Sequence, residues 1–128
     1  MILIERPMLA PLNSPADTPT FFEDIQYPQL VSPKIDGIRA VIGYAVKQDF
    51  TSLDLCSSGE LEISVLSRNM DKFRSRQAQS LFGVPELLHM DGEMAYNPIA
   101  PDCLHVTQGH LSAFDKPCET LKYYVFDW

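Results

Sequence analysis

The feature that most constrains the fold of this chain is the alternation of apolar and polar side chains in residues 60–68, ELEISVLSR. Successive side chains of a β-strand point to opposite faces of the sheet, so this pattern predicts a half-buried strand ending near Arg68. Residues 38–46, IRAVIGYAV, and 121–128, LKYYVFDW, are rich in β-branched and aromatic side chains and predict two more strands. Residues 87–96, LLHMDGEMAY, predict another, so a sheet should form the centre of the fold.

Turn and cap signals place the connections between these strands. Asp36-Gly37 is a turn dipeptide, and it predicts a tight connection between a strand at 30–34, LVSPK, and the strand at 38–46. Residues 97–117 contain proline, asparagine and glycine and are expected to be an irregular segment that could include a short helix.

One helix is expected to follow the strand that ends near Arg68. Asn69 or Asp71 could cap a helix that continues to about Phe82, and Gly83-Val84-Pro85 would end it. Within this helix the side chains of Phe73, Leu81 and Phe82 should face inward. Strands and helices without regular β-α-β alternation favour an α+β fold with mainly antiparallel sheet and flanking helices.

The bulk composition sets broad limits. A chain of 128 residues, 45% hydrophobic and 21% charged, has the size and composition of one folded domain with a single core. No apolar run approaches the ~20 residues of a membrane span, and the N-terminus lacks the pattern of a signal peptide. A cytoplasmic protein with no membrane partner is therefore expected. The three cysteines, Cys56, Cys103 and Cys118, are an odd number without framework spacing and should be reduced thiols.

The charge distribution gives two opposing signals about nucleic acid. The formal net charge of −7 argues against a broad nucleic-acid-binding surface, because phosphate neutralisation needs clustered lysine and arginine. However, Arg68, Lys72, Arg74 and Arg76 fall within nine positions and predict one local basic patch.

Three stretches carry candidate chemistry. The first is SPKIDGIR, residues 32–39, in which Lys34, Asp36 and Arg39 surround a turn. Taken alone, this stretch could be a charged hairpin turn with solvated side chains. The second is Asp91-Gly92-Glu93, whose two carboxylates should share one face of a strand and could hold Mg²⁺ or a ribose hydroxyl, or form a solvated edge.

The third stretch is YYVFDW, residues 123–128. Its alternation places Tyr124, Phe126 and Trp128 on one face of the strand and Tyr123, Val125 and Asp127 on the other. An aromatic face is most often core, and it is also a surface on which a planar base stacks. A lysine, an acidic strand and an aromatic strand together predict a nucleotide pocket that contains a nucleophile.

At these residues the chain resembles the covalent nucleotidyltransferases, specifically ATP-dependent DNA ligases of the bacteriophage type. KIDGIR at 34–39 matches that family's nucleophile motif, K-x-D-G-x-R, at every fixed position. The other matching stretches occur in the family order and extend the resemblance over essentially the whole chain; they are RPMLAPL (6–12), VLSRNM (65–70), LHMDGEM (88–94), HVTQGHLSAFDKP (105–117) and KYYVFDW (122–128). The resemblance implies an ATP-grasp-like nucleotidyltransferase domain.

The resemblance also implies roles for the nucleophile motif. Lys34 would attack the α-phosphorus of ATP, expel pyrophosphate and become a lysyl-adenylate. Arg39 would contact the nucleotide and its phosphates, and Ser32 would contact adenine. Asp36 and Gly37 would shape the turn around the nucleophile.

Roles for the later motifs follow in the same way. Glu93 would bind the ribose or the catalytic Mg²⁺, with Asp91 as its structural companion, and Phe126 would stack on adenine. Arg68 would contact the nucleotide or the 5′-phosphate of nicked duplex DNA, and Arg74 is the second expected DNA contact. The implied cofactors are therefore ATP and Mg²⁺, and the implied partner is nicked DNA in replication, repair or recombination, in the bacterial host cytoplasm if the chain is phage-encoded.

Some parts of the family pattern do not occur in this sequence. A later E-G-x-hydrophobic segment, a K-x-K segment and the OB-fold domain are not found in it. The sequence also stops at Trp128 within a predicted strand. Residues 1–128 are therefore expected to be a truncated adenylation domain, which alone should not seal nicks and which a missing C-terminal half would complete.

Alternative functions remain open at the level of sequence. An RNA ligase or a capping guanylyltransferase uses the same chemistry, and a non-catalytic ATP-binding fragment would keep the pocket without forming an adduct. Cys103, His105, His110 and Cys118 are residue types that bind zinc, but their spacing fits no common zinc site, so loop residues with free thiols are favoured.

Overall fold

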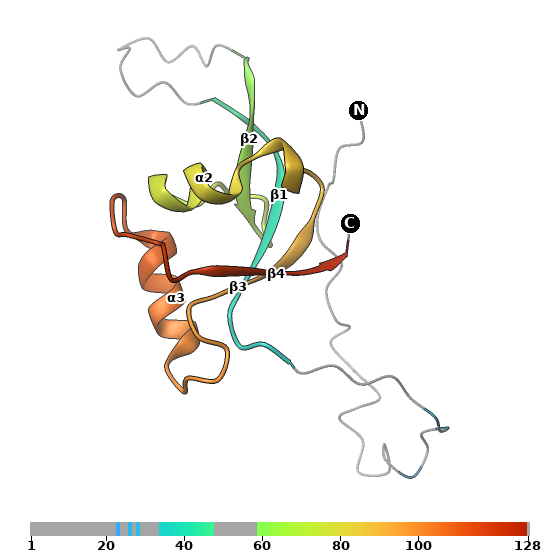
Figure 1. The fold of residues 1–128 in the computed structure, drawn as a ribbon. Helices are drawn as coiled ribbons and strands as arrows, with labels where there is room; N and C mark the ends of the chain where they lie inside the picture. The colour runs from blue at the N-terminus through green and yellow to red at the C-terminus, as the bar shows by residue number, and fades with distance from the viewer. Residues whose placement is uncertain (1–22, 24–25, 27, 29–33, 48–58, 128) are drawn as a thin grey trace.

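The centre of the fold is a four-stranded antiparallel sheet with two helices on one of its faces (Figure 1). This computed structural model describes residues 23, 26, 28, 34–47 and 59–127. The strands have the order β2-β1-β3-β4, and their bounds are Ile38–Val46 (β1), Leu61–Ser67 (β2), Asp91–Ala95 (β3) and Lys122–Asp127 (β4). The helices are α2, Arg76–Phe82, and α3, Cys103–Ser112, with a short 3₁₀ turn η2, Pro85–Leu87. The predicted α+β class with mainly antiparallel sheet is confirmed.

The strand predictions hold where the residues are described, with one correction. β1, β2 and β4 begin and end within about one residue of the predicted ranges. β3 is shorter than the predicted 87–96, because Pro85 begins the turn η2 and His89 adopts a left-handed backbone with φ 73°. A short apolar run does not distinguish a strand from a helical segment by periodicity alone.

The start of helix α2 differs from the prediction. Its cap is Ser75, whose hydroxyl accepts a hydrogen bond from Ala78 N at 3.2 Å, and not Asn69 or Asp71. The chain after β2 instead turns back, so that Lys72 forms a bridge with Leu66. The helix ends at Gly83 as predicted.

The predicted inward face of the helix region is partly correct. Phe73 and Phe82 pack against the core, whereas Leu81 is an exposed hydrophobic side chain. The side chain of Gln79 faces β2 instead, where its amide accepts from Val65 N at 2.7 Å and donates to Val65 O at 3.0 Å. Gln79 therefore completes the hydrogen bonding of an edge strand and fixes the helix against it.

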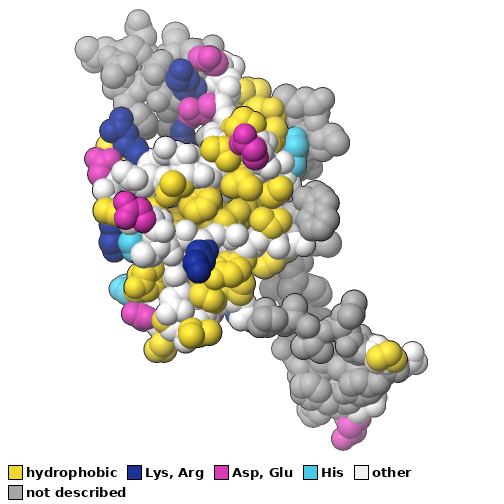
Figure 2. Space-filling model, viewed as in Figure 1, with side chains coloured by type: hydrophobic (Ala, Val, Ile, Leu, Met, Phe, Trp, Pro, Cys, Tyr) yellow, Lys and Arg dark blue, Asp and Glu magenta, His cyan; other side chains and the backbone are white. Residues whose placement is uncertain are grey.

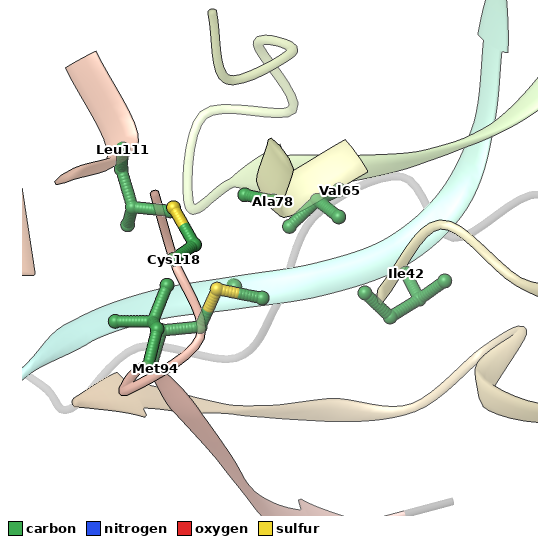
Figure 3. Packing of buried hydrophobic residues seen from close by; sticks show 8 residues of the cluster. Ile42, Val65, Ala78, Met94, Leu111 and Cys118 are labelled. Atoms are coloured by element: carbon green, nitrogen blue, oxygen red, sulfur yellow. The ribbon is translucent and has the colours of Figure 1, made fainter. Parts of the chain in front are cut away.

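The hydrophobic core lies between the sheet and the two helices. Figure 3 shows Ile42 of β1, Val65 of β2 and Met94 of β3 close to Ala78 of α2 and Leu111 of α3. Cys118, in the segment before β4, packs in the same cluster. We call the side of the sheet that carries these residues the helix face and the opposite side the far face.

The surface carries both signs of charge. On the face in Figure 2, apolar side chains gather in the middle, and lysine and arginine side chains lie among aspartate and glutamate. None of the helices in the described ranges is long and apolar enough to cross a membrane.

Several predictions fall on residues outside the described part of the chain. These are the strand at 30–34 except for Lys34, the adenine contact Ser32, the thiol Cys56 and the last aromatic residue, Trp128. Lys34 itself lies outside regular secondary structure, three residues before Gly37.

Candidate functional site

The charged motif residues lie together on the far face because strand side chains alternate. Ile38 of β1 is paired with Met94 of β3, and both belong to the helix face. The next residues along, Arg39 and Glu93, are paired with each other and must point to the far face. Asp91, two residues before Glu93 on the same strand, shares that face. The sheet register therefore joins the nucleophile motif to the D-G-E motif.

Arg39 and Asp91 form a bidentate ion pair across the two strands. Arg39 Nε donates to Asp91 Oδ1 at 3.0 Å, and Nη2 donates to Oδ2. Both side chains are mostly buried, with 26% and 20% of their surfaces exposed. The hydrogen bond to Asp91 raises the pKa of Arg39, against the lowering by burial. The guanidinium is therefore a fixed positive charge on the far face.

Glu93 holds the backbone that follows Lys34. Its Oε1 accepts a hydrogen bond from Gly37 N at 3.2 Å. A Cβ at position 37 would lie 2.1 Å from Met94 O and 2.9 Å from Glu93 Cγ, so only glycine allows this close approach. Burial raises the pKa of Glu93, whereas the Gly37 hydrogen bond and the charges of Arg39 and Lys34 lower it by less.

Lys34 is highly exposed and lies three residues before Gly37 in the chain. Its Nζ is 3.5 Å from Asp36 Oδ1, and the two side chains are 86% and 68% exposed. The positive charge of Lys34 acts on the pKa of Glu93, which places the amine within electrostatic range of the D-G-E motif.

The aromatic strand divides its side chains between the two faces. Tyr123 packs against the core, and its hydroxyl lies 3.0 Å from Ala40 O and 2.9 Å from Met90 O. Phe126 is 53% exposed, and the guanidinium carbon of Arg39 lies 5.9 Å from the centre of its ring. Phe126 therefore presents an accessible ring beside the Arg39–Asp91 pair, on the far face.

A cleft of about 380 Å³ opens where β1 begins and β2 ends. Three motif stretches and helix α3 contribute its lining residues, which are Gly37, Ile38, Arg39, Ser67, Arg68, Asn69, Glu93 and Leu104. Within the described ranges, Arg68 has no carboxylate partner, whereas Arg39 is paired with Asp91. Arg68 is thus a cation in the wall of the cleft that no described carboxylate neutralises.

The remaining basic residues of the predicted patch do not line the cleft. Lys72 pairs with Glu62, and the guanidinium of Arg76 lies 4.8 Å from the ring centre of Phe114. Arg74, the second predicted DNA contact, is exposed just before α2. The patch is therefore divided into one cleft residue and three residues near α2.

In the described part of the chain, Glu93 is the carboxylate that lines the cleft. Among the described residues, no group of three or more histidine, cysteine, aspartate or glutamate side chains could hold a metal ion. Asp91 is occupied by Arg39, and Oε1 of Glu93 is occupied by Gly37 N, so Oε2 of Glu93 remains. Mg²⁺ is commonly held by one or two carboxylates together with substrate phosphates and water, so a single carboxylate fits a nucleotide-bound ion.

Three of the four residues of zinc-binding type, Cys103, His110 and Cys118, make other contacts. Cys103 and Cys118 are buried free thiols, and Cys118 Sγ lies 3.5 Å from the Ser75 hydroxyl. His110 Nδ1 lies 2.7 Å from Pro117 O, and His105 is exposed on the same helix. Cys103, His105 and His110 lie in α3 and not in a loop, which corrects that part of the prediction.

Sequence reasoning missed four residues of the cleft, of which Ile38 lies between the predicted Gly37 and Arg39. Ser67 and Asn69 flank Arg68 in the segment VLSRNM, so their position beside the predicted arginine was a usable signal. Leu104 gave no signal, because only the packing of α3 against the sheet brings it to the cleft. The pairing of Arg39 with Asp91 was also unexpected, since residues 52 positions apart meet only through the sheet register.

Comparison of the chain with protein-family models, with curated proteins and with solved structures gives no match.

Proposed function

We propose that this chain is the adenylation part of an ATP-dependent DNA ligase and that Lys34 is the residue that receives AMP. The observation that carries the proposal is the convergence of separate motifs on one cleft. Arg39, Arg68 and Glu93 come from β1, from the end of β2 and from β3, and all three line it. A concave site of this volume with a few converging polar groups has the size and character of a small-ligand pocket.

The chemistry assigned to Lys34 is nucleophilic displacement at the α-phosphorus of ATP. A new P–N bond forms to Nζ, the bond between the α-phosphorus and the bridging oxygen breaks, and pyrophosphate leaves with that oxygen. The attacking amine must be neutral and loses a proton as the bond forms. Asp36, with Oδ1 3.5 Å from Nζ, lies within reach of that proton.

The two arginines would have different tasks. Arg68 has no carboxylate partner among the described residues and is available for phosphate oxygens, to which a guanidinium can donate two parallel hydrogen bonds. Arg39 is held by Asp91 and offers its remaining N–H groups from a fixed position. Preorganised charge of this kind stabilises the negative charge that develops on a leaving pyrophosphate.

Glu93 and Phe126 would bind the rest of the nucleotide. The free Oε2 of Glu93 can accept from a ribose hydroxyl or coordinate Mg²⁺, an ion that would screen the phosphate charge and help the pyrophosphate to leave. The accessible ring of Phe126 provides a surface for stacking of the base.

The proposed substrate is nicked duplex DNA. Arg68 would contact the 5′-phosphate at a nick after the adenylate has formed, and the exposed Arg74 would contact the DNA backbone outside the cleft. An RNA ligase or a capping enzyme would use the same adenylation or guanylylation step, and the strand that is sealed distinguishes them. We also propose that the protein acts in the cytoplasm.

One observation favours a second candidate, a module that binds ATP without forming an adduct. The Lys34 side chain is 86% exposed and is ion-paired with Asp36. A protonated, paired amine has no free lone pair for attack.

The test is covalent labelling of the full 128-residue chain with ATP that is labelled at the α-phosphate, with Mg²⁺ present. We expect slow formation of an acid-labile adduct that is lost in Lys34→Ala and in Lys34→Arg, because a guanidinium stays protonated. Lys47→Ala, which removes an exposed lysine paired with Glu60, is the matched control and should label like the parent.

The outcomes separate the candidates. An adduct that persists in Lys34→Ala contradicts the assignment of the nucleophile. ATP binding without any adduct supports the non-covalent module. A chain that neither binds ATP nor becomes labelled contradicts both.

A further inference from the structure

Three successive backbone N–H groups converge on Ser67, the last residue of β2. Asn69 N and Asp71 N donate to the Ser67 hydroxyl at 3.2 and 3.3 Å, and Met70 N donates to the Ser67 carbonyl at 2.8 Å. Ser67 N in turn donates to Asp71 O at 2.8 Å. One residue therefore organises the whole of the turn at 67–71.

The turn contains a backbone conformation that needs such support. Met70 has φ 67°, in the left-handed region that costs a residue with a Cβ roughly 1–2 kcal/mol. The two bonds to the Ser67 hydroxyl come from the residues on either side of Met70. Conformations of this kind persist only where the surrounding contacts hold them.

The turn also forms one wall of the cleft. Ser67, Arg68 and Asn69 are three consecutive lining residues, and Leu104 of α3 is another. No hydrogen bond or ion pair within the described residues holds the Arg68 side chain, so its position depends on the backbone that carries it.

We propose that Ser67 is a positioning residue that acts through Arg68: its hydroxyl fixes the turn at 67–71 so that the guanidinium of Arg68 faces the phosphates of a bound nucleoside triphosphate. The inference rests on the proposed function, because it assigns phosphate binding to Arg68. Ser67 itself is not assigned a contact with the nucleotide.

The test is a double-mutant cycle on the full chain, read by calorimetric titration with ATP and Mg²⁺. Ser67→Ala should weaken ATP binding about five-fold, the equivalent of roughly one net hydrogen bond. Ser67→Thr keeps the hydroxyl and should restore most of the affinity. Arg68→Ala should weaken binding by on the order of ten-fold or more, since it removes a charged donor.

The decisive measurement is the ATP affinity of the double variant Ser67→Ala/Arg68→Ala. If Ser67 acts through Arg68, then Ser67→Ala in the Arg68→Ala background should weaken binding by less than about two-fold, a clear departure from additivity. A general structural role would instead give the same five-fold loss in both backgrounds. Ser75→Ala is the control, because it removes the buried cap of α2 and should lower the melting temperature without changing ATP affinity.

Every outcome decides the inference. Equal losses in both backgrounds, failure of Ser67→Thr to restore binding, or an unchanged affinity in Ser67→Ala would each overturn it while leaving the proposed function standing. A parent chain that does not bind ATP overturns the inference together with the proposed function.

Discussion

The two faces of strand β1 differ in chemistry although their residues alternate along the same nine-residue strand. On the helix face, Ala40 and Ile42 are fully buried and pack with Met94 and Leu111. On the far face, Arg39 is held by Asp91 and lies beside the exposed ring of Phe126. The helix face is stabilised by removal of apolar surface from water, whereas the far face combines a fully buried Val41 with fixed charges that have unused hydrogen-bonding capacity.

This difference predicts different effects for substitutions on the two faces. Loss of a buried methylene group costs folding free energy and leaves a cavity, with little specific effect on a ligand. Loss of a charge from the far face should change ligand binding or the rate of adenylation more than the free energy of unfolding. Four predictions, given in decreasing order of expected effect, test whether substitutions on the two faces have different consequences.

Met94→Ala should give the largest loss of stability. Met94 is fully buried in the cluster between sheet and helices, and truncation of such a side chain typically costs about 2–5 kcal/mol. The free energy of unfolding from urea titration measures it. Leu104→Ala is the control, since Leu104 is 43% exposed in the cleft and should lose less than about 1 kcal/mol. Equal losses in the two variants would mean that the buried Met94 contributes no more to stability than a partly exposed leucine.

Glu93→Gln should affect chemistry instead of stability. The substitution keeps the shape of the side chain and removes its charge, so the rate of lysine adenylation should fall by about 10²-fold or more. Labelling with α-labelled ATP measures the rate, and urea titration should show no loss of stability. A parent-like rate would show that this carboxylate has only a structural role.

Asp91→Asn should lower stability although Asp91 lies on the far face, because the Arg39–Asp91 ion pair is mostly buried. Loss of the charged partner of Arg39 should cost about 1.5–3 kcal/mol of the free energy of unfolding, the range for hydrogen bonds to charged groups. Glu62→Gln breaks the more exposed pair with Lys72 and should cost less than about 1 kcal/mol. If both variants unfold alike, the Arg39–Asp91 pair adds nothing beyond a surface ion pair.

The smallest expected effect is a dependence of stability on pH. Burial raises the pKa of Glu93 above its ordinary value of 4.5, so the folded chain holds this proton at pH values where the unfolded chain has released it. Stability from this group is complete below about pH 4.5 and is lost as the pH rises through the folded pKa.

Glu93→Gln removes this titration and provides its check. The difference in unfolding free energy between the variant and the parent should favour the variant more strongly at pH 7 than at pH 4. A difference that does not change between these pH values would show that Glu93 is not desolvated on the far face.

Local patterns in the sequence were sufficient to predict the strands and the residue sets they carry. Period-two alternation located β2, and the β-branched and aromatic runs located β1 and β4, because side-chain direction in a strand depends only on position along the chain. The same rule placed Asp91 and Glu93 on one face. The motif residues Lys34, Arg39 and Arg68 were also identified from sequence, and their assigned roles stay predictions.

The tertiary structure decided which of these residues meet. The pairing of Arg39 with Asp91 and the bond from Gly37 N to Glu93 depend on the register between β1 and β3, which no local pattern contains. The cap of α2 moved to Ser75 because the turn organised by Ser67 uses the residues that local capping rules favoured. Leu104 reaches the cleft only through the packing of α3 on the sheet. Strand periodicity and the candidate chemical residues could be predicted from sequence, because each depends on short stretches of the chain. The geometry of the site could not, because contacts between distant residues depend on all the surrounding elements at once.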